Sequence, residues 1–80
     1  MKSYKELEHQ MKEQLEKLVE WSGSQVRLAH CLNVSRQVVH SWVKRGRISA
    51  SMAIEVEKLT KGRFTKRDLR PDVIKWIDEE

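Results

Sequence analysis

The sequence predicts a small all-α protein, and its length, composition and apolar periodicity support this fold class. The chain has 80 residues, of which 39% are hydrophobic and 35% are charged, a balance that suits one compact core with a charged exterior. A chain of this length buries only about 60 to 65% of its unfolded surface, so a second core is not expected. Apolar residues recur at helical spacing, and no alternating strand pattern of useful length occurs. We therefore expect a single domain over residues 1–80.

The boundaries of the helices are indicated by glycines and by capping side chains. A glycine just past a helix supplies the left-handed residue that ends it, and the chain has three at suitable intervals, Gly23, Gly46 and Gly62. Hydroxyl side chains that can begin helices are Ser24, Ser35, either Ser49 or Ser51, and Thr65, which resembles a capping box with Asp68. These signals predict five helices, at residues 4–21, 25–32, 36–44, 50–60 and 66–70.

Both ends of the chain carry apolar stripes. The long first helix has Tyr4, Leu7, Met11, Leu15, Leu18 and Val19 on one side, and only its end near Leu18 is required to pack on the following helices. Pro71 disfavours helical geometry at Arg70, so a short amphipathic tail over residues 71–80 is expected to follow a break. Its apolar face consists of Val73, Ile74, Trp76 and Ile77. Either this face or the first helix can supply a homodimer seam, and Trp21 and Trp76 at helix ends also point to an interface.

Charge is distributed unevenly along the chain. Residues 23–70 contain 11 Lys and Arg against 3 Asp and Glu, which leaves a net charge of +8, whereas residues 1–22 and 71–80 carry −1 and −3. A basic block of this size is typical of a protein that binds a polyanion such as nucleic acid, although a solvated face can also be rich in basic residues.

Several classes of function are disfavoured by what the sequence lacks. No apolar run approaches the roughly 20 residues that cross a bilayer, and no signal-peptide stretch is present, so we expect a cytoplasmic protein. Cys31 has no second cysteine for a disulfide or a metal site, and we expect it to be partly buried. His9, His30 and His40 have no metal-ligand spacing. Because no nucleophile, base and orienting acid can be assigned, we expect no enzyme, and no cofactor is implied.

Residues 25–44 have the pattern of two short helices that cross at a steep angle. Leu28, Ala29 and Leu32 form one apolar face, and Val39, Trp42 and Val43 form the other. Ala29 permits the close approach of the two helices, because a larger side chain would separate them. Val34 can fill the corner, and Asn33 tolerates the left-handed conformation that a tight turn requires. The pattern predicts a helix–turn–helix.

This segment resembles the helix–turn–helix of Cro-type and repressor-type phage regulators, and in particular the Cro-like YdaS group. The motifs that carry the resemblance are Gly23–Gln25, Leu28–Ala29, Asn33–Ser35, Val38–Trp42, Gly46–Ile48, Ile54–Glu57 and Leu69–Asp72. Asn33 departs from the family, which usually has glycine there. The resemblance implies a compact lambda-repressor-like domain of five helices, encoded by a phage or prophage, that acts as a transcription regulator.

The same resemblance implies which residues contact double-stranded operator DNA. The second helix of such a motif lies in the major groove with its N-terminal side chains against base edges, so Arg36, Gln37, His40 and Ser41 are the candidates for base contacts. Candidates for phosphate contacts are Gln25, Arg27, Ser35, Lys44, Arg45 and Arg47.

Two functions are open at this point. The first is a Cro-like repressor that binds a palindromic operator as a homodimer. The alternative is an antitoxin-like protein-interaction module that sequesters a toxin-like partner and binds DNA for autoregulation. No metal or other cofactor is expected in either case.

Overall fold

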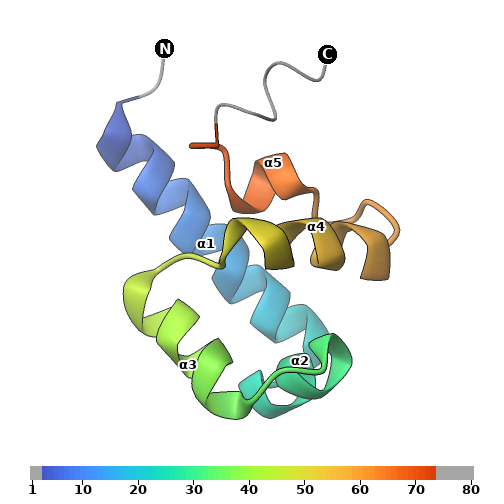
Figure 1. The fold of residues 1–80 in the computed structure, drawn as a ribbon. Helices are drawn as coiled ribbons and strands as arrows, with labels where there is room; N and C mark the ends of the chain where they lie inside the picture. Colours follow the sequence, from blue (N-terminus) through green and yellow to red (C-terminus); the bar gives the residue numbers. More distant parts are fainter. Residues whose placement is uncertain (1–2, 74–80) are drawn as a thin grey trace.

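The all-α fold is confirmed. The computed structural model describes residues 3–73, and five helices account for its regular secondary structure there (Figure 1). They are α1 (Tyr4–Ser22), α2 (Gln25–Leu32), α3 (Arg36–Arg45), α4 (Ala50–Leu59) and α5 (Lys66–Leu69). Each predicted helix is present, and its ends differ from the expected ones by no more than one residue.

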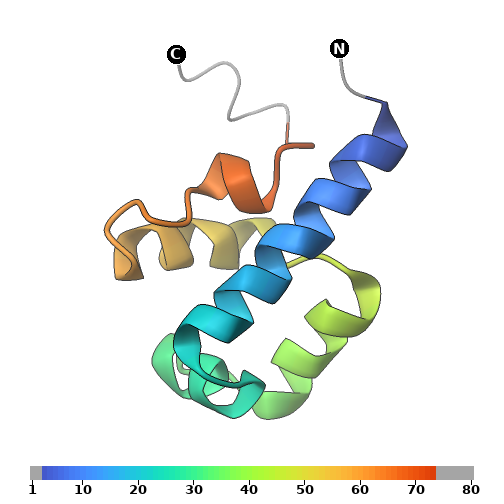
Figure 2. The same cartoon turned by 180° about the vertical axis from the view of Figure 1, so that it is seen from behind.

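The long helix α1 runs diagonally across the molecule, with α2, α3 and α5 packed against it and α4 packed on α2 and α5. Seen from behind, α4 and α5 lie on one side of α1, α3 lies on the other, and α2 lies beside its C-terminal end (Figure 2). This arrangement leaves the outward faces of α2 and α3 together at one end of the protein, away from the N-terminus of α1.

Most of the predicted caps form, with one correction. The side chains of Ser24, Ser35 and Ser49 accept backbone N–H groups in the first turns of α2, α3 and α4, so Ser49 and not Ser51 is the cap. The capping box of Thr65 and Asp68 is complete. Gly23 and Gly46 end α1 and α3 as expected. The prediction for Gly62 was wrong in detail, because α4 ends at Leu59 and Thr60 is its C-cap.

Gly62 belongs instead to the turn that follows α4. Lys61 and Gly62 both have positive φ angles, 54° and 86°, and the Gly62 N–H donates to the carbonyl of Glu57 at 2.9 Å. The hydroxyl of Thr60 donates to the Val56 carbonyl and accepts from the Phe64 N–H. These bonds reverse the chain and direct Phe64 into the core.

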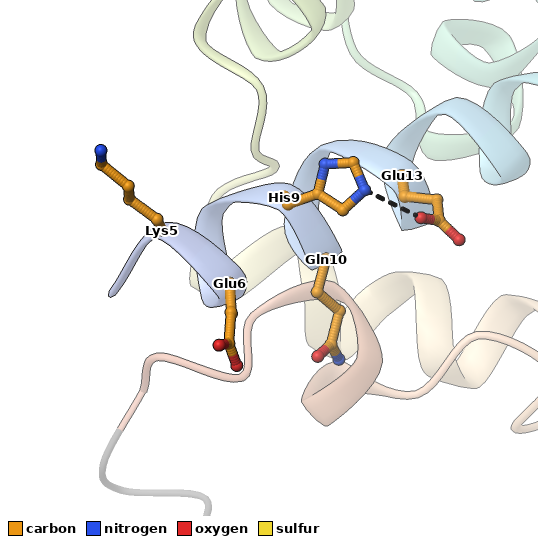
Figure 3. A pocket seen from close by; sticks show the side chains of 5 residues that line it. All are labelled: Lys5, Glu6, His9, Gln10 and Glu13. Atoms are coloured by element: carbon orange, nitrogen blue, oxygen red, sulfur yellow. Dashed lines mark ion pairs between the residues drawn. The ribbon is translucent and has the colours of Figure 1, made fainter. Parts of the chain in front are cut away.

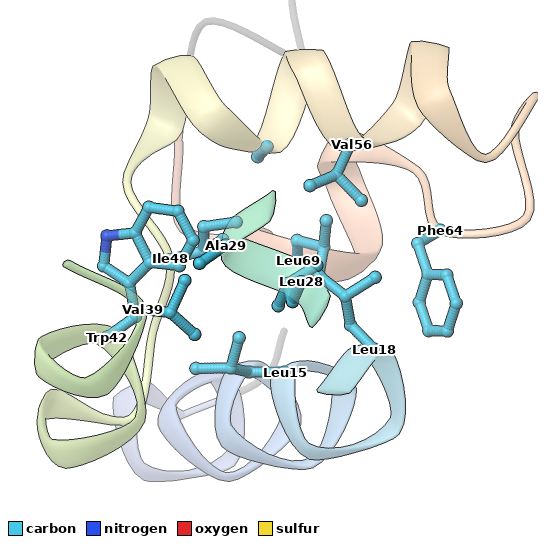
Figure 4. Close-up of a cluster of buried hydrophobic side chains, with 11 residues drawn as sticks. Leu15, Leu18, Leu28, Ala29, Val39, Trp42, Ile48, Val56, Phe64 and Leu69 are labelled. Atoms are coloured by element: carbon cyan, nitrogen blue, oxygen red, sulfur yellow. The ribbon is translucent and has the colours of Figure 1, made fainter. Parts of the chain in front are cut away.

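All five helices contribute to one hydrophobic core (Figure 4). Trp42 lies inside it with 2% of its surface exposed, as its place on the inward face of the predicted motif indicated. The core also contains Leu15, Leu18, Leu28, Ala29, Val39, Ile48, Ala53, Val56, Phe64 and Leu69.

The sequence required only the end of α1 near Leu18 to pack on the following helices, and the structure buries more of the helix. Its buried stripe extends back through Leu15 to Met11, because α3 and α5 both pack along this helix. Tyr4, at the far end, is 59% exposed. Little of the apolar stripe of α1 is therefore left for another molecule.

The chain turns sharply after α5, and Arg70 fastens this corner to the rest of the fold. Its Nε and Nη2 donate to the two carboxylate oxygens of Asp72 at 2.9 and 3.0 Å, and its Nη1 donates to the Ile48 carbonyl at 3.0 Å. The hydrogen bonds from Arg70 lower the pKa of the Asp72 carboxyl, against the opposing effect of partial burial. The same pairing raises the pKa of Arg70.

Residues 71–73 form a turn and not the start of a helix. Val73 is half-buried there, whereas the other predicted seam residues, Ile74, Trp76 and Ile77, lie outside the described part of the chain.

Candidate nucleic-acid interface

The turn between α2 and α3 consists of three residues, Asn33 to Ser35. Asn33 adopts the left-handed conformation with φ 56°, so it can stand where glycine would be the ordinary choice. The Val34 N–H donates to the Ala29 carbonyl at 3.0 Å, and the Val34 side chain packs against the core. Ser35 then begins α3 by accepting the Val38 N–H. The inward faces of the two helices are held by the core, and their outward faces remain exposed.

Side chains from both helices line one depression of about 310 Å³ on this outward surface. Its lining consists of Gln25 at the start of α2 and Arg36, Gln37 and His40 on the first turns of α3. Arg36, Gln37 and His40 are exposed. Within residues 3–73, their side chains form no hydrogen bond or ion pair. Three of the four predicted base-contacting residues therefore lie together with their polar groups available.

Ser41, the fourth base-contact candidate, is placed differently. It is half-buried and does not line the depression. Its hydroxyl donates to the Val38 carbonyl of the same helix at 2.8 Å. A hydroxyl that donates within its own helix keeps only acceptor capacity for another group.

The predicted phosphate-contacting residues divide into two groups. Gln25, Arg27 and Ser35 lie at the N-terminal ends of α2 and α3. The side chain of Arg27 folds over Gly23, where an added Cβ would approach its Cδ to 3.0 Å. Gly23 thus leaves space for the arginine as well as adopting its positive φ.

The second group, Lys44, Arg45 and Arg47, lies at the C-terminal end of α3. The Arg45 Nε donates to the Ser41 carbonyl at 3.4 Å, and the Arg47 Nη1 donates to the Tyr4 hydroxyl at 3.5 Å. Arg45 and Arg47 line a hollow of about 170 Å³ against α1, together with Glu8, His9, Met11, Lys12 and Gly46. Lys12 was not predicted as a site residue, because it belongs to α1, whose net charge is negative.

The charged side chains of α2 and α3 have one sign. No Asp or Glu occurs between Glu20 and Glu55, so α2 and α3 contain basic residues without acidic ones. The first turns of α1 and α5 each carry an acidic side chain, and those of α2, α3 and α4 carry none. An acidic residue there stabilises a helix by about 0.3 to 1 kcal/mol. Its absence leaves the positive ends of α2 and α3 open to an external anion.

The expectation for Cys31 was wrong, and Trp21 has a partner that was not predicted. Cys31 is exposed and not partly buried. It lines a groove of about 460 Å³ between α2 and α4 with Leu32, Met52, Glu55, Lys58 and Leu59. Trp21 has a partner inside the protein, because its ring meets that of Phe64 edge to face with centroids 6.1 Å apart. It nevertheless remains 42% exposed.

A hollow of about 560 Å³ on α1 is less suited to a charged ligand. It is lined by Lys5, Glu6, His9, Gln10 and Glu13 (Figure 3). The Nε2 of His9 lies 3.4 Å from Glu13, whose other oxygen pairs with Lys17 at 3.3 Å. Its charged side chains therefore have mixed signs and partly neutralise one another.

The described residues form neither a metal site nor a membrane span. Among residues 3–73, no group of three or more His, Cys, Asp or Glu side chains could hold a metal ion. None of the helices described there combines the length and the apolar character that a bilayer span needs.

The fold and this surface define a small all-α protein with an exposed basic face built from two short helices. A family model described as bacterial toxin YdaS matches residues 15–77, which include α2 to α5 and the second half of α1. The protein belongs to this family, as its motifs indicated. No curated protein and no solved structure matches the chain.

Proposed function

We propose that the protein is a sequence-specific regulator of transcription that binds double-stranded DNA through α2 and α3. The observation that carries this proposal is the convergence of Gln25, Arg36, Gln37 and His40 on one exposed depression, within a surface free of acidic residues. The function is binding and not catalysis. Its setting is the bacterial cytoplasm, and its resemblance to phage regulators favours a phage or prophage origin.

In this proposal α3 enters the major groove, which is about 12 Å wide and admits one helix. Arg36 can donate two hydrogen bonds to O6 and N7 of guanine, and Gln37 can pair with N6 and N7 of adenine. His40 follows one turn later on the same face. Gln25 and the N-terminal amides of α2 meet a phosphate, which sets the depth and direction of α3 in the groove.

We also propose that the protein binds a palindromic operator as a homodimer and represses by occluding a promoter. One such motif reads too few base pairs for useful specificity, and two half-sites about 34 to 36 Å apart would double the readout. The burial of the α1 stripe back to Met11 favours the C-terminal seam of Val73, Ile74, Trp76 and Ile77. Sedimentation of the saturated complex should give two chains for each operator, and one chain would exclude the dimer.

Selection of bound sequences from random duplex DNA tests the proposed function directly. Repeated rounds should enrich a short sequence with two-fold symmetry, and binding to it should weaken steeply as salt is raised, because several counterions are released from phosphates. A pool that remains random after several rounds would contradict sequence-specific binding.

The family description favours a second candidate, a protein-interaction module. The description names a toxin, and the groove between α2 and α4 exposes Leu32, Met52 and Leu59 beside Cys31. An antitoxin-like chain of this kind would sequester a toxin-like partner and use DNA binding for autoregulation, whereas the family description itself names a toxin. Co-purification of a neighbouring gene product with the full chain, but not with a chain ending at Val73, would favour this candidate if both chains bound DNA equally.

A further inference from the structure

A hollow at the junction of α1 and α3 has the composition of an anion-binding site. Glu8, His9, Met11 and Lys12 line it from α1, and Arg45, Gly46 and Arg47 line it from the end of α3. Met11 is buried and closes its base. A Cβ placed on Gly46 would lie 3.8 Å from the Cβ of Lys12, an ordinary van der Waals contact, so α1 passes directly beside this end of α3.

Three of these side chains are cations without a carboxylate partner. Within residues 3–73, no carboxylate lies within ion-pair distance of Lys12, Arg45 or Arg47. Glu8 is the one acidic residue of the lining, so the charge that remains is positive. Asp72 also interacts electrostatically with Arg47, but both its oxygens accept hydrogen bonds from Arg70.

The two arginines keep donors for a ligand. Arg45 uses its Nε for the Ser41 carbonyl, and Arg47 uses one Nη1 contact for the Tyr4 hydroxyl. A guanidinium has five N–H groups, so most of those on each arginine remain free, and they suit the oxygens of a phosphate. Lys12 adds an ammonium group from the neighbouring helix.

We propose that this hollow, formed by Lys12, Arg45 and Arg47, binds a phosphate of the DNA backbone. The inference rests on the proposed function and extends the interface onto α1. At 1.5 Å per residue the 10 residues of α3 span about 15 Å, which exceeds the groove width of about 12 Å. Where α3 crosses the groove at an angle, with Arg36 against base edges at one end, its other end reaches the backbone strand that borders the groove. Lys12 precedes the family match, which begins at residue 15.

Substitution of Lys12 by glutamine tests the site against a matched control on the same helix. Lys17→Gln removes the same charge, but Lys17 pairs with Glu13 and lines a different hollow, beside Trp21 and Phe64. On the selected duplex, Lys12→Gln should reduce the slope of log affinity against log salt by about 0.9, the value for one phosphate contact. Lys17→Gln should leave the slope unchanged. Equal effects of the two variants, or none of Lys12→Gln, would overturn the site.

Glu8→Gln should change the affinity for DNA in the opposite direction. Removal of the one carboxylate that lines the hollow should strengthen binding of the same duplex, because the positive charge facing the phosphate rises. Unchanged or weaker binding by a variant that melts like the parent chain would count against the hollow as a phosphate site.

Titration with inorganic phosphate distinguishes a backbone phosphate from a free one and separates this inference from the proposed function. In the parent chain the NMR signals of Gly46 and Arg47 amides should shift to saturation, and Lys12→Gln should abolish this. If those shifts occur and duplex DNA is not bound at all, the anion site stands with a free phosphate as its ligand and the proposed function fails. If DNA binding requires Arg36 but not Lys12, the proposed function stands and this site fails.

Discussion

Arg36 and Arg70 belong to the same basic block of sequence, yet the fold uses them in different ways. Arg36 is exposed on the first turn of α3, and its side chain has no partner within residues 3–73. The side chain of Arg70 is only 17% exposed and donates to both oxygens of Asp72 and to the Ile48 carbonyl. One arginine is available to a ligand, and the other holds two segments of the chain together.

The same contrast separates the two halves of the block. Around α5 the carboxylates have partners within the protein: Glu57 accepts the Lys66 N–H at 2.7 Å, and Asp68 accepts the Thr65 N–H. Along α2 and α3 no carboxylate is present in the sequence, so their basic side chains and N-termini are not neutralised locally. The residues that give the block its net charge of +8 thus belong partly to a structural corner and partly to a proposed binding surface. The net charge alone does not distinguish these two roles.

Substitution of Trp42 by alanine should have the largest effect on stability, because the buried face of α3 holds its exposed face in position. Loss of a buried tryptophan costs about 3 to 5 kcal/mol, which is comparable to the whole stability of so small a domain. We expect Trp42→Ala to be unfolded at room temperature by circular dichroism. Trp21→Ala is the control, since Trp21 is 42% exposed, and it should remain folded. A cooperative melt of Trp42→Ala close to that of the parent chain would contradict the core shown here.

Alanine at Arg36 or at Gln37 should separate binding from stability. Each substitution should weaken binding to the selected operator by about 1 to 3 kcal/mol, the usual range for a bidentate base contact, and weaken binding to random DNA much less. Thermal stability should change by no more than about 0.5 kcal/mol, because both side chains are exposed. Arg63→Ala, an exposed arginine on the turn before α5, should alter neither quantity.

If both variants kept the parent chain's preference for the operator over random DNA, α3 would not be the recognition helix. An equal loss on operator and random DNA would instead assign Arg36 and Gln37 to the phosphate backbone.

The features that could be predicted from the sequence are those that depend on near neighbours in the chain. A serine cap, its N–H partner three residues later and the left-handed Asn33 all lie within one turn, so their residue types reveal them. The grouping of Arg36, Gln37 and His40 follows from helical spacing once the start of α3 is known. The caps and the left-handed turn were predicted correctly for that reason.

The features that were missed depend on contacts between distant segments. Periodicity assigns Trp21 to a helix face but does not reveal that Phe64 will lie against it. The contact of Arg47 with Tyr4 spans 43 residues of sequence. Lys12 joins the basic hollow only because α1 crosses the end of α3. Cys31 was expected to be partly buried, but its place on α2 exposes it.

Glutamine at Arg70 tests the structural side of the comparison. Removal of the Arg70 guanidinium leaves the Asp72 carboxylate and the Ile48 carbonyl without their donor. Hydrogen bonds to charged groups contribute about 1.5 to 3 kcal/mol when buried. Because this corner is partly exposed, we expect Arg70→Gln to lower the free energy of unfolding by about 1 to 2 kcal/mol in urea denaturation. Arg63→Gln removes the same charge from an exposed position and should change it by less than about 0.5 kcal/mol. Equal stability of the two variants would mean that the Arg70 contacts contribute nothing.

The smallest expected effect is the acid dependence that Asp72 confers on this corner. Its pKa is lowered in the folded protein, chiefly by the hydrogen bonds from Arg70, so the folded state favours the ionised carboxylate. The resulting stability is fully present above the unfolded pKa of about 3.9, and it is lost as the pH falls through the lower pKa of the folded state. Between about pH 5 and pH 2, the parent chain should therefore lose about 1 kcal/mol more stability than Asp72→Asn, which cannot ionise there. Glu13→Gln is the control, because Glu13 lies in an exposed cluster with His9 and Lys17, and its acid dependence should follow that of the parent. If Asp72→Asn lost as much stability in acid as the parent chain, the pairing with Arg70 would not hold the corner in solution, and the contrast between Arg70 and Arg36 would not describe how the protein is stabilised.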